Sequence, residues 1–337
     1  MKVISCEEPR RFTVKEEDVP KIKKDEVLIK VKRIGICGTD IHAFYGNQPF
    51  FTYPRVLGHE LSGEIVEVGM NDRDLKAGDL VAIIPFLECG KCIACRKGKM
   101  NCCTNMKVFG VHIDGGMKEY IKLPIDHVLK VNGISFDKAA MIEPLSIGAH
   151  AVRRAKLEEH QFALVIGGGP IGLGVMKFAK LAGAKVIAMD INEERLQFCK
   201  DWAHVDFTIH ARKDPVEEIA KMTNGDFPEV VFDVTGNKSS MMNAFQYVSH
   251  GGQLVYVGLV KDDLSFNDPE FHKREMSLLG SRNATPEDFE YVISCMKNGD
   301  IDVNRMITKR FTLDDIVTDF EEVTNPVNNT IKAFIEV

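Results

Sequence analysis

ALVIGGGPIGLGVMKFAKLAGAKVIAMD, residues 163–190, is the stretch that decides the fold of about half of this chain. An apolar run leads into three spaced glycines, Gly167, Gly169 and Gly172, and a helical pattern then leads to a second apolar run that ends at Asp190. This order predicts a strand, a glycine-rich turn, a helix and a strand, in which the glycines let a dinucleotide pyrophosphate approach the helix N-terminus. A carboxylate at Asp190 can bind the adenosine ribose and repel a 2′-phosphate, so we expect NAD rather than NADP; an N-cap of the following helix is the structural alternative.

Strand and helix patterns continue on both sides of this unit, and 337 residues are enough for about two domains. EVVFDVTG and GGQLVYVGLV extend the same alternation, which predicts a parallel sheet. Residues 1–145 carry short apolar and β-branched runs typical of a β-rich domain. Beyond about 283 we expect a helix (PEDFEYVISCMKNG), a short strand, a second helix (DDIVTDFEEVTN) and a last strand (TIKAFIEV). The predicted α/β protein has a β-rich domain of residues 1–146 and 284–337 and a doubly wound domain of residues 147–283.

The composition excludes several classes of function. A formal net charge of −6 without a basic stripe offers little to nucleic acid or to an anionic membrane surface. No stretch approaches the roughly 18–20 apolar residues that span a bilayer, and the start, MKVISCEEPR, has no apolar core of a signal peptide, so we expect a cytoplasmic protein. Nine cysteines, an odd number, argue against a disulfide framework.

Five cysteines crowd into one short segment. Cys89, Cys92, Cys95 and Cys103 have the spacing C-x2-C-x2-C-x7-C, and four thiolates can close a tetrahedral shell around a structural zinc. An iron–sulfur cluster uses the same ligands, and exposed free thiols are the plain alternative. Spacing alone does not exclude Cys102 in place of Cys103, although we prefer Cys103.

A second group of metal-binding residue types is spread over a longer distance. Cys37 stands in GICGTDIH after a predicted strand, His59 and Glu60 begin GHELSGEIVEVG, and Glu143 lies in IEPLS. A thiolate, an imidazole and carboxylates suit a catalytic zinc, which keeps one position for water or substrate. Any one of these residues alone is more often part of a core.

Taken together, these motifs resemble the zinc-containing medium-chain dehydrogenase/reductase family. The order C-G-T-D-x-H, G-H-E-x2-G-x5-G, the four-cysteine lobe at about 88–104 and the glycine-rich turn spans essentially the whole chain. The resemblance implies a GroES-like catalytic domain, a Rossmann domain, and one catalytic and one structural zinc per chain. It implies that Cys37 and His59 bind the catalytic zinc together with one or both of Glu60 and Glu143. A carboxylate at Glu143 is the pattern of sorbitol and other polyol dehydrogenases, in which it can hold a zinc-bound water.

Further roles follow only from the resemblance. Thr39 and His42 match a proton relay, although a bound water could replace it and His42 could be structural. Arg195 lies near the adenine or is a solvated helix residue. The implied cofactor contacts are Gly167, Gly169, Pro170, Ile171, Gly172, Asp190, Arg195, Thr235 and Gly258. Relatives are dimers or tetramers, and the resemblance implies a homotetramer for this chain. In bacterial relatives a Rossmann edge strand, here QLVYVGLV or its neighbour, pairs across a two-fold axis.

The substrate is indicated by three stretches: HAFYGNQPFFTYPRVLGHE, FGVHIDGGMKEY and DPEFHKREMSLLGSRNATPEDF. They resemble bacterial dehydrogenases that oxidise a sugar acid at C5, L-galactonate to D-tagaturonate or L-gulonate to D-fructuronate. A guanidinium at Arg282 can bind a carboxylate bidentately, or it touches the cofactor. Asn47, His112 and Asn283 are candidate contacts to substrate hydroxyls, and a hinge or backbone hydrogen-bonding role is the alternative for each. Phe50 and Phe109 line the pocket or belong to the core, and a neutral polyol, threonine or a simple alcohol remains the alternative substrate.

Overall fold

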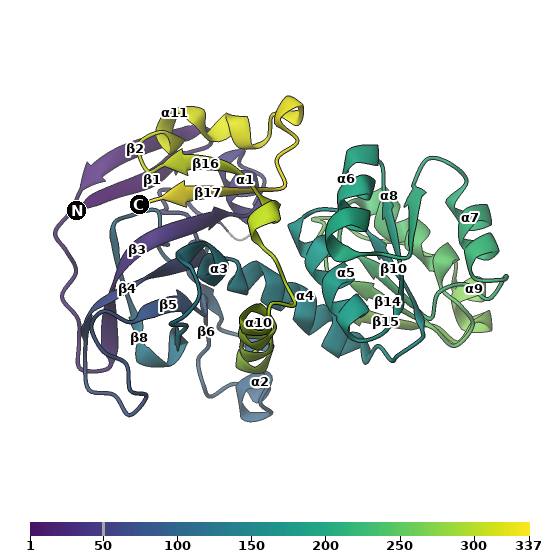
Figure 1. The fold of residues 1–337 in the computed structure, drawn as a ribbon, viewed down its shortest axis with the longest axis horizontal. Helices are drawn as coiled ribbons and strands as arrows, with labels where there is room; N and C mark the ends of the chain where they lie inside the picture. The colour runs from purple at the N-terminus through teal and green to yellow at the C-terminus, as the bar shows by residue number, and fades with distance from the viewer. Residues whose placement is uncertain (49–50) are drawn as a thin grey trace. The chain divides into compact units, whose positions relative to one another are not determined.

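The computed structural model describes residues 1–48 and 51–337 (Figure 1). The chain divides into two compact units, Met1–Glu143 with Thr285–Val337, and Pro144–Ala284. The expected divisions at 146/147 and 283/284 therefore differ from the observed ones by three residues and by one. The first division falls inside a helix, α4 (Ile142–Ala155), which places no loop there for a sequence pattern to reveal.

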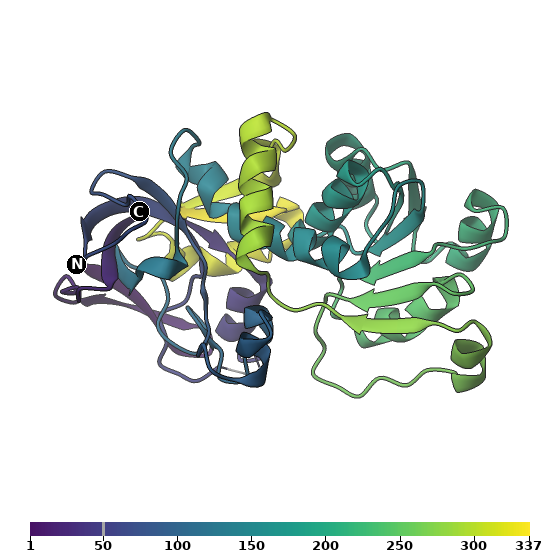
Figure 2. The same ribbon diagram turned by 90° about the horizontal axis from the view of Figure 1, so that it is seen from below.

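The second unit is built on one six-stranded parallel sheet with the strand order β12-β11-β10-β13-β14-β15. Its strands are β10 (Phe162–Ile166), β11 (Lys185–Asp190), β12 (Phe207–His210), β13 (Val230–Asp233), β14 (Gln253–Tyr256) and β15 (Ser277–Gly280). Its helices include α5 (Pro170–Leu181), α6 (Glu193–Phe198), α7 (Pro215–Met222), α8 (Lys238–Asn243) and α9 (Asp268–Lys273). Figures 1 and 2 show helices on both faces of this sheet. The predicted doubly wound parallel sheet is confirmed, and its strand order reverses between β10 and β13.

The glycine-rich turn joins β10 to α5 as the spacing predicts. Gly169 is the N-cap and Pro170 the first residue of α5. Gly167 has a φ of +109°, and a side chain at Gly172 would collide with the carbonyl oxygen of Gly167. The first and third glycines of the motif are therefore required by the backbone itself.

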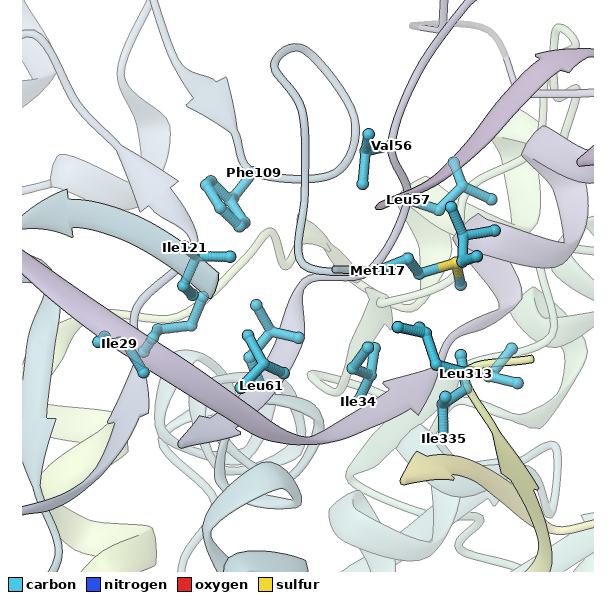
Figure 3. Packing of buried hydrophobic residues seen from close by; sticks show 14 of the residues in the cluster. Ile29, Ile34, Val56, Leu57, Leu61, Phe109, Met117, Ile121, Leu313 and Ile335 are labelled. Carbon is cyan, nitrogen blue, oxygen red and sulfur yellow. The ribbon is translucent and has the colours of Figure 1, made fainter. Parts of the chain in front are cut away.

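The first unit is β-rich. A seven-stranded sheet has the order β16-β17-β3-β4-β5-β9, with β8 also paired to β3. Its strands are β3 (Glu26–Ile36), β4 (Glu60–Val68), β5 (Leu80–Ile83), β8 (Tyr120–Pro124), β9 (Val128–Lys130), β16 (Ile307–Thr312) and β17 (Lys332–Glu336). Two antiparallel pairs complete it, β1 (Lys2–Glu8) with β2 (Arg11–Glu16), and β6 (Phe86–Leu87) with β7 (Lys107–Val108). The alternating apolar residues of β3 and β4 bury Ile29, Ile34 and Leu61 in one core (Figure 3).

One helical prediction needs correction. Residues 136–155 form α3 (Phe136–Ala140) and then α4, and the predicted helix after 283 is present as α10 (Pro286–Asn298). DDIVTDFEEVTN does not form one helix but a short α11 (Ile316–Asp319) followed by a 3-10 turn. The Thr318 hydroxyl donates to the Asp315 carbonyl and to the Asp319 carboxylate, and such local side-chain bonds compete with helix continuation. No helix among the described residues is both long and apolar enough to cross a membrane.

A surface ion-pair network joins α3 to the sheet of the first unit and predicts an acid sensitivity. Arg33 Nε lies 2.7 Å and Arg310 Nη2 2.5 Å from the Asp137 carboxylate. Partial burial opposes ionisation, but the hydrogen bonds from Arg310 and Arg33 outweigh it and lower the pKa of Asp137. A lowered folded pKa stabilises the fold above the unfolded pKa of about 3.9, and this contribution is lost as the pH falls through the folded value.

We therefore expect Asp137→Asn to lower the free energy of unfolding by about 1 kcal/mol at pH 7. The difference from the wild-type protein should begin to shrink below about pH 4, where Asp137 of the unfolded chain becomes protonated, and should vanish below the lowered pKa of the folded state. Urea unfolding of both proteins at pH 7 and below about pH 4 measures this difference in the free energy of unfolding. A constant difference across this range would contradict the assignment.

Candidate active site and metal centres

Three potential zinc ligands converge where β3 ends and β4 begins. Cys37 follows the last residue of β3 and is the N-cap of α1 (Gly38–Phe44), and Glu60 is the first residue of β4. Antiparallel pairing sets Gly35 opposite Glu60, which brings the two segments together. One donor atom from each of Cys37, His59 and Glu60 lies within 4.8 Å of the other two. Three protein ligands of these types suit a zinc ion that keeps an open position.

A glycine makes room for one of these ligands. A side chain at Gly35 would collide with the Glu60 carboxylate, which therefore lies over the bare backbone of β3. On its other side Gly35 pairs with β17, so the Glu60 carboxylate lies over a strand that has β17 as its next neighbour. The sequence reasoning did not identify this role of Gly35.

Lys332 on β17 reaches the Glu60 carboxylate. Its ammonium forms an ion pair with the Glu60 carboxylate, and the two side chains are only 2% and 1% exposed. Burial alone would lower the pKa of Lys332, but the charges of Glu60 and Cys37 outweigh it and raise the pKa. Sequence reasoning missed Lys332, because a single lysine in a terminal strand is typical of a solvated face.

Asp40 holds the two ligand segments together. Its carboxylate accepts hydrogen bonds from the backbone N–H of Cys37 at 2.9 Å and of Gly58 at 3.1 Å, and the side chain is completely buried. Asp40 Oδ1 also lies 3.7 Å from His59 Nδ1. A carboxylate facing one ring nitrogen is the common outer partner of a metal-bound histidine, so Nε2 of His59 remains for the metal. The C-x-x-D spacing of a helix cap was a signal for Asp40 that the prediction did not use.

Glu143 is buried close to this group without belonging to the set of three. Burial raises the pKa of Glu143 to about 8; His59 opposes the shift, and the charges of Glu60 and Cys37 add to it. Of the two predicted carboxylates, Glu60 shares the donor set with Cys37 and His59, and Glu143 lies outside it.

The charges of the site favour a divalent cation. Burial and the Glu60 charge raise the pKa of the Cys37 thiol to about 12, although metal coordination deprotonates a thiol outright. Burial alone would lower the pKa of His59, yet Asp40, Glu143 and Glu60 together raise it. His59 Nδ1 is buried without a hydrogen bond among the described residues. The raised pKa values of Cys37 and Glu143 show that these buried acids oppose one another's ionisation, which a bound zinc ion would favour, and the donor types fit zinc.

The four-cysteine lobe forms a second, closed set. The sulfurs of Cys89, Cys92, Cys95 and Cys103 lie within 4.8 Å of one another. Hydrogen bonds from the backbone N–H groups of Cys95 and Thr104 lower the pKa of the Cys92 thiol to about 5, as suits a thiolate ligand. Cys103 is buried among these sulfurs whereas Cys102 is exposed, which favours Cys103 as the fourth ligand.

We expect Cys92→Ser to reduce the zinc content from two ions to one per chain and to lower the thermal midpoint. A closed zinc site supplies folding free energy to a lobe that has little core of its own. Native mass spectrometry counts the ions, and calorimetry measures the midpoint. Cys102→Ser is the matched control and should keep two ions; an unchanged count in Cys92→Ser would refute the lobe as a zinc site.

The other predicted residues of the first unit lie on α1, just after it, and in the loop that follows β7. Thr39 is half-buried and its backbone N–H donates to the Cys37 sulfur, and His42 is exposed one turn further along α1. Asn47 is exposed after this helix, and its N–H donates to the His42 carbonyl. His112 Nδ1 accepts a hydrogen bond from the Val108 N–H at 3.0 Å, so one ring nitrogen is used to stabilise its own loop.

Of the two phenylalanines, Phe109 is 5% exposed and belongs to the core of Figure 3, which supports its structural alternative. Phe50 lies outside the described residues. Arg282, which is exposed, and Asn283 follow β15 in the second unit.

The cofactor candidates of the second unit gather at the carboxyl ends of its strands. The Asp190 carboxylate accepts from the Gly168 N–H at 2.6 Å and from the Asn192 N–H at 2.9 Å. The N-cap of α6 is Asn192, so the capping alternative for Asp190 is wrong. Arg195 is half-buried beside Asp190: burial lowers the pKa of its guanidinium and the Asp190 charge opposes the shift. Thr235 lies over the first glycine, since its methyl carbon is 3.3 Å from where a Gly167 side chain would begin.

Comparison with known proteins agrees with this arrangement. The alcohol dehydrogenase GroES-like domain family matches residues 23–133, and the zinc-binding dehydrogenase family matches residues 170–298. L-galactonate-5-dehydrogenase of Escherichia coli K12 is 44% identical over 98% of this chain and 96% of its own length. The chain belongs to the zinc-containing medium-chain dehydrogenase family.

Other members of this family are similar along their whole length. Sorbitol dehydrogenase of Bacillus subtilis is 32% identical over 99% of this chain and 97% of its own. An Escherichia coli CFT073 alcohol dehydrogenase, solved in complex with NADH, superposes with a TM-score of 0.93 at 31% identity, covering 100% of this chain and 99% of the other. The predicted GroES-like and Rossmann domains of this medium-chain dehydrogenase are thereby confirmed.

Proposed function

We propose that this medium-chain dehydrogenase transfers a hydride from a secondary alcohol to NAD and that its substrate is a sugar acid oxidised at C5, L-galactonate or L-gulonate. The observation that carries the proposal is the group of Cys37, His59 and Glu60, three buried or half-buried donors of types that leave a zinc ion one open position. The relationship to an L-galactonate-5-dehydrogenase supports the substrate, and the NADH complex of a related structure supports the cofactor.

Each residue has a defined part in this reaction. Zinc held by Cys37 and His59 would supply a Lewis acid for the substrate hydroxyl. Bound NAD⁺ would accept the hydride of the carbinol C–H bond, so that the products would be a ketone, NADH and one proton. Thr39 and His42 on α1 provide a hydroxyl and an exposed imidazole along which that proton can leave, and the buried carboxyl group of Glu143 can hold it instead.

The choice of cofactor and the contacts to the substrate complete the proposal. Asp190 selects NAD because its carboxylate lies beside the glycine-rich turn, where a 2′-phosphate would be repelled. Arg282 binds the substrate carboxylate, and Asn47, His112 and Asn283 bind its hydroxyls. A neutral polyol is the second candidate, favoured by the relationship to sorbitol dehydrogenase.

Formation of NADH by the zinc-loaded protein tests the substrate. L-galactonate, L-gulonate, D-sorbitol, L-threonine and a simple secondary alcohol are offered at matched concentrations. A strong signal with an aldonate alone supports the C5 reaction, and Arg282→Ala should then raise KM for the aldonate. A signal with sorbitol alone would refute the role of Arg282 in binding a substrate carboxylate, but it would still agree with zinc- and NAD-dependent oxidation of an alcohol.

We also propose a homodimer or homotetramer formed through β15. It is the edge of the six-stranded sheet, and Leu278 on it is 41% exposed. An exposed apolar edge strand is suited to pairing with a second copy across a two-fold axis. The nine cysteines form no disulfide among the described residues, which supports a location in the reducing cytoplasm. Leu278→Lys should shift the protein to monomers in sedimentation analysis, and an unchanged mass would overturn this interface.

A further inference from the structure

Asp233 is a buried acidic residue to which the proposed chemistry gives no part. It is the last residue of β13, it is completely buried, and it lies in the doubly wound sheet between β10 and β14. Burial raises the pKa of Asp233 and its hydrogen bonds do not fully offset that effect. Because burying a carboxylate costs free energy unless it is hydrogen-bonded, the partners of Asp233 indicate what it stabilises.

Those contacts all lead to the turn between β13 and α8. Asp233 Oδ1 accepts from the Thr235 N–H at 2.9 Å and from the Thr235 hydroxyl at 2.7 Å. Its Oδ2 accepts from the Ser240 hydroxyl on α8 at 2.6 Å. The Thr235 hydroxyl in turn accepts from the Asn237 N–H at 3.0 Å. One carboxylate thus fixes both ends of a short turn whose Thr235 is exposed.

The backbone of Asp233 holds the neighbouring strand end as well. Its carbonyl accepts from the N–H groups of Val257 and Gly258, at 2.9 and 3.0 Å, just beyond β14. A side chain at Gly258 would collide with the backbone nitrogen of Gly236, so the two turns are in direct contact. Thr235 and Gly258 are therefore held in fixed relation to one another and to Gly167.

Topology indicates which part of a dinucleotide these turns face. The strand order reverses between β10 and β13, and a dinucleotide binds across the carboxyl ends of the strands at such a point. The glycine-rich turn after β10 serves the pyrophosphate, and Asp190 at the end of β11 serves the adenosine ribose. The nicotinamide half consequently falls to the carboxyl ends of β13 and β14, where Thr235 and Gly258 stand.

We propose that Asp233 is a positioning residue whose buried carboxylate holds the turn of Thr235 and the start of α8 in place for the nicotinamide half of NAD. This inference rests on the proposed NAD-dependent function. Its buried carboxylate acts through Thr235 and Ser240, and its backbone carbonyl holds the N–H of Gly258. Preorganisation of this kind lowers the ordering cost of binding.

Binding of NADH and of AMP, measured separately by titration, tests the proposal. Asp233→Ala should weaken NADH binding by about tenfold or more, because hydrogen bonds to a charged group are lost, and should leave AMP binding unchanged. Asp233→Asn keeps an acceptor for Thr235 and should restore most of the NADH affinity. Ser240→Ala should weaken NADH binding by a smaller factor, and Ser239→Ala, on the exposed neighbour in α8, is its matched control.

The outcomes are distinguishable. If the wild-type protein binds no NADH, the proposed function fails before this inference is reached. If it binds NADH and the variants bind it equally well, Asp233 has no positioning role. An equal loss of NADH and AMP affinity would show general damage to the sheet and would also overturn the proposal. Should Asp233→Ala not fold, Ser240→Ala against Ser239→Ala decides the same question.

Discussion

Cys37→Ser is expected to lower kcat/KM for alcohol oxidation by about 10³-fold or more and to leave one zinc ion per chain instead of two. Lewis-acid stabilisation of a developing alkoxide contributes several kcal/mol, and each 1.4 kcal/mol is a factor of about ten in rate. Cys37 is the only thiol of its three-residue donor set, and the other four clustered thiols belong to the lobe at 89–103. The loss should therefore fall on the catalytic ion alone.

Steady-state kinetics and native mass spectrometry measure the two effects on one preparation. Cys6→Ser is the matched control, because Cys6 is a buried cysteine of the same unit whose sulfur bonds only weakly to the Glu8 carbonyl at 3.5 Å. It should retain two zinc ions and most of the activity. Two ions and near-normal turnover in Cys37→Ser would contradict the assignment of the catalytic site.

Features encoded in contiguous sequence were predictable from sequence alone. The turn at Gly167, Gly169 and Gly172 has one structural solution, since its spacing and its flanking apolar runs define both the strand and the helix. The cysteine lobe is similarly local, and burial of Cys103 then separates it from Cys102. The break after Asp319 was not predictable from periodicity, because hydrogen bonds of individual side chains decide it.

The residues that support the catalytic site depend on strand pairing between distant segments. Lys332 reaches Glu60 only because β17 pairs with β3 in the register that sets Ala333 opposite Ile36. The role of Gly35 likewise depends on which residue of β4 lies opposite it. A register of this kind is specified by tertiary packing and leaves no local pattern, so a buried lysine and a required glycine both resembled ordinary strand residues.

Lys332→Met is expected to lower the free energy of unfolding of the chelator-treated protein by about 3–5 kcal/mol. The substitution removes the ammonium and leaves the Glu60 carboxylate, which is 1% exposed, buried without its cation. A bound zinc ion supplies positive charge to the same carboxylate, so the loss should be smaller in the zinc-loaded protein. Zinc should consequently raise the unfolding temperature of the variant by more than it raises that of the wild-type protein.

Calorimetry of both proteins with zinc and with chelator gives the four unfolding temperatures that this comparison needs. Lys332→Met combined with Glu60→Gln removes both charges, and it should recover most of the stability lost in the single variant because no unpaired charge remains. If single and double variants unfold at the same temperature in chelator, the ion pair is not what Lys332 contributes. An equal loss with and without zinc would instead mean that the metal and Lys332 do not share Glu60, and Glu143 would become the better candidate for the third ligand.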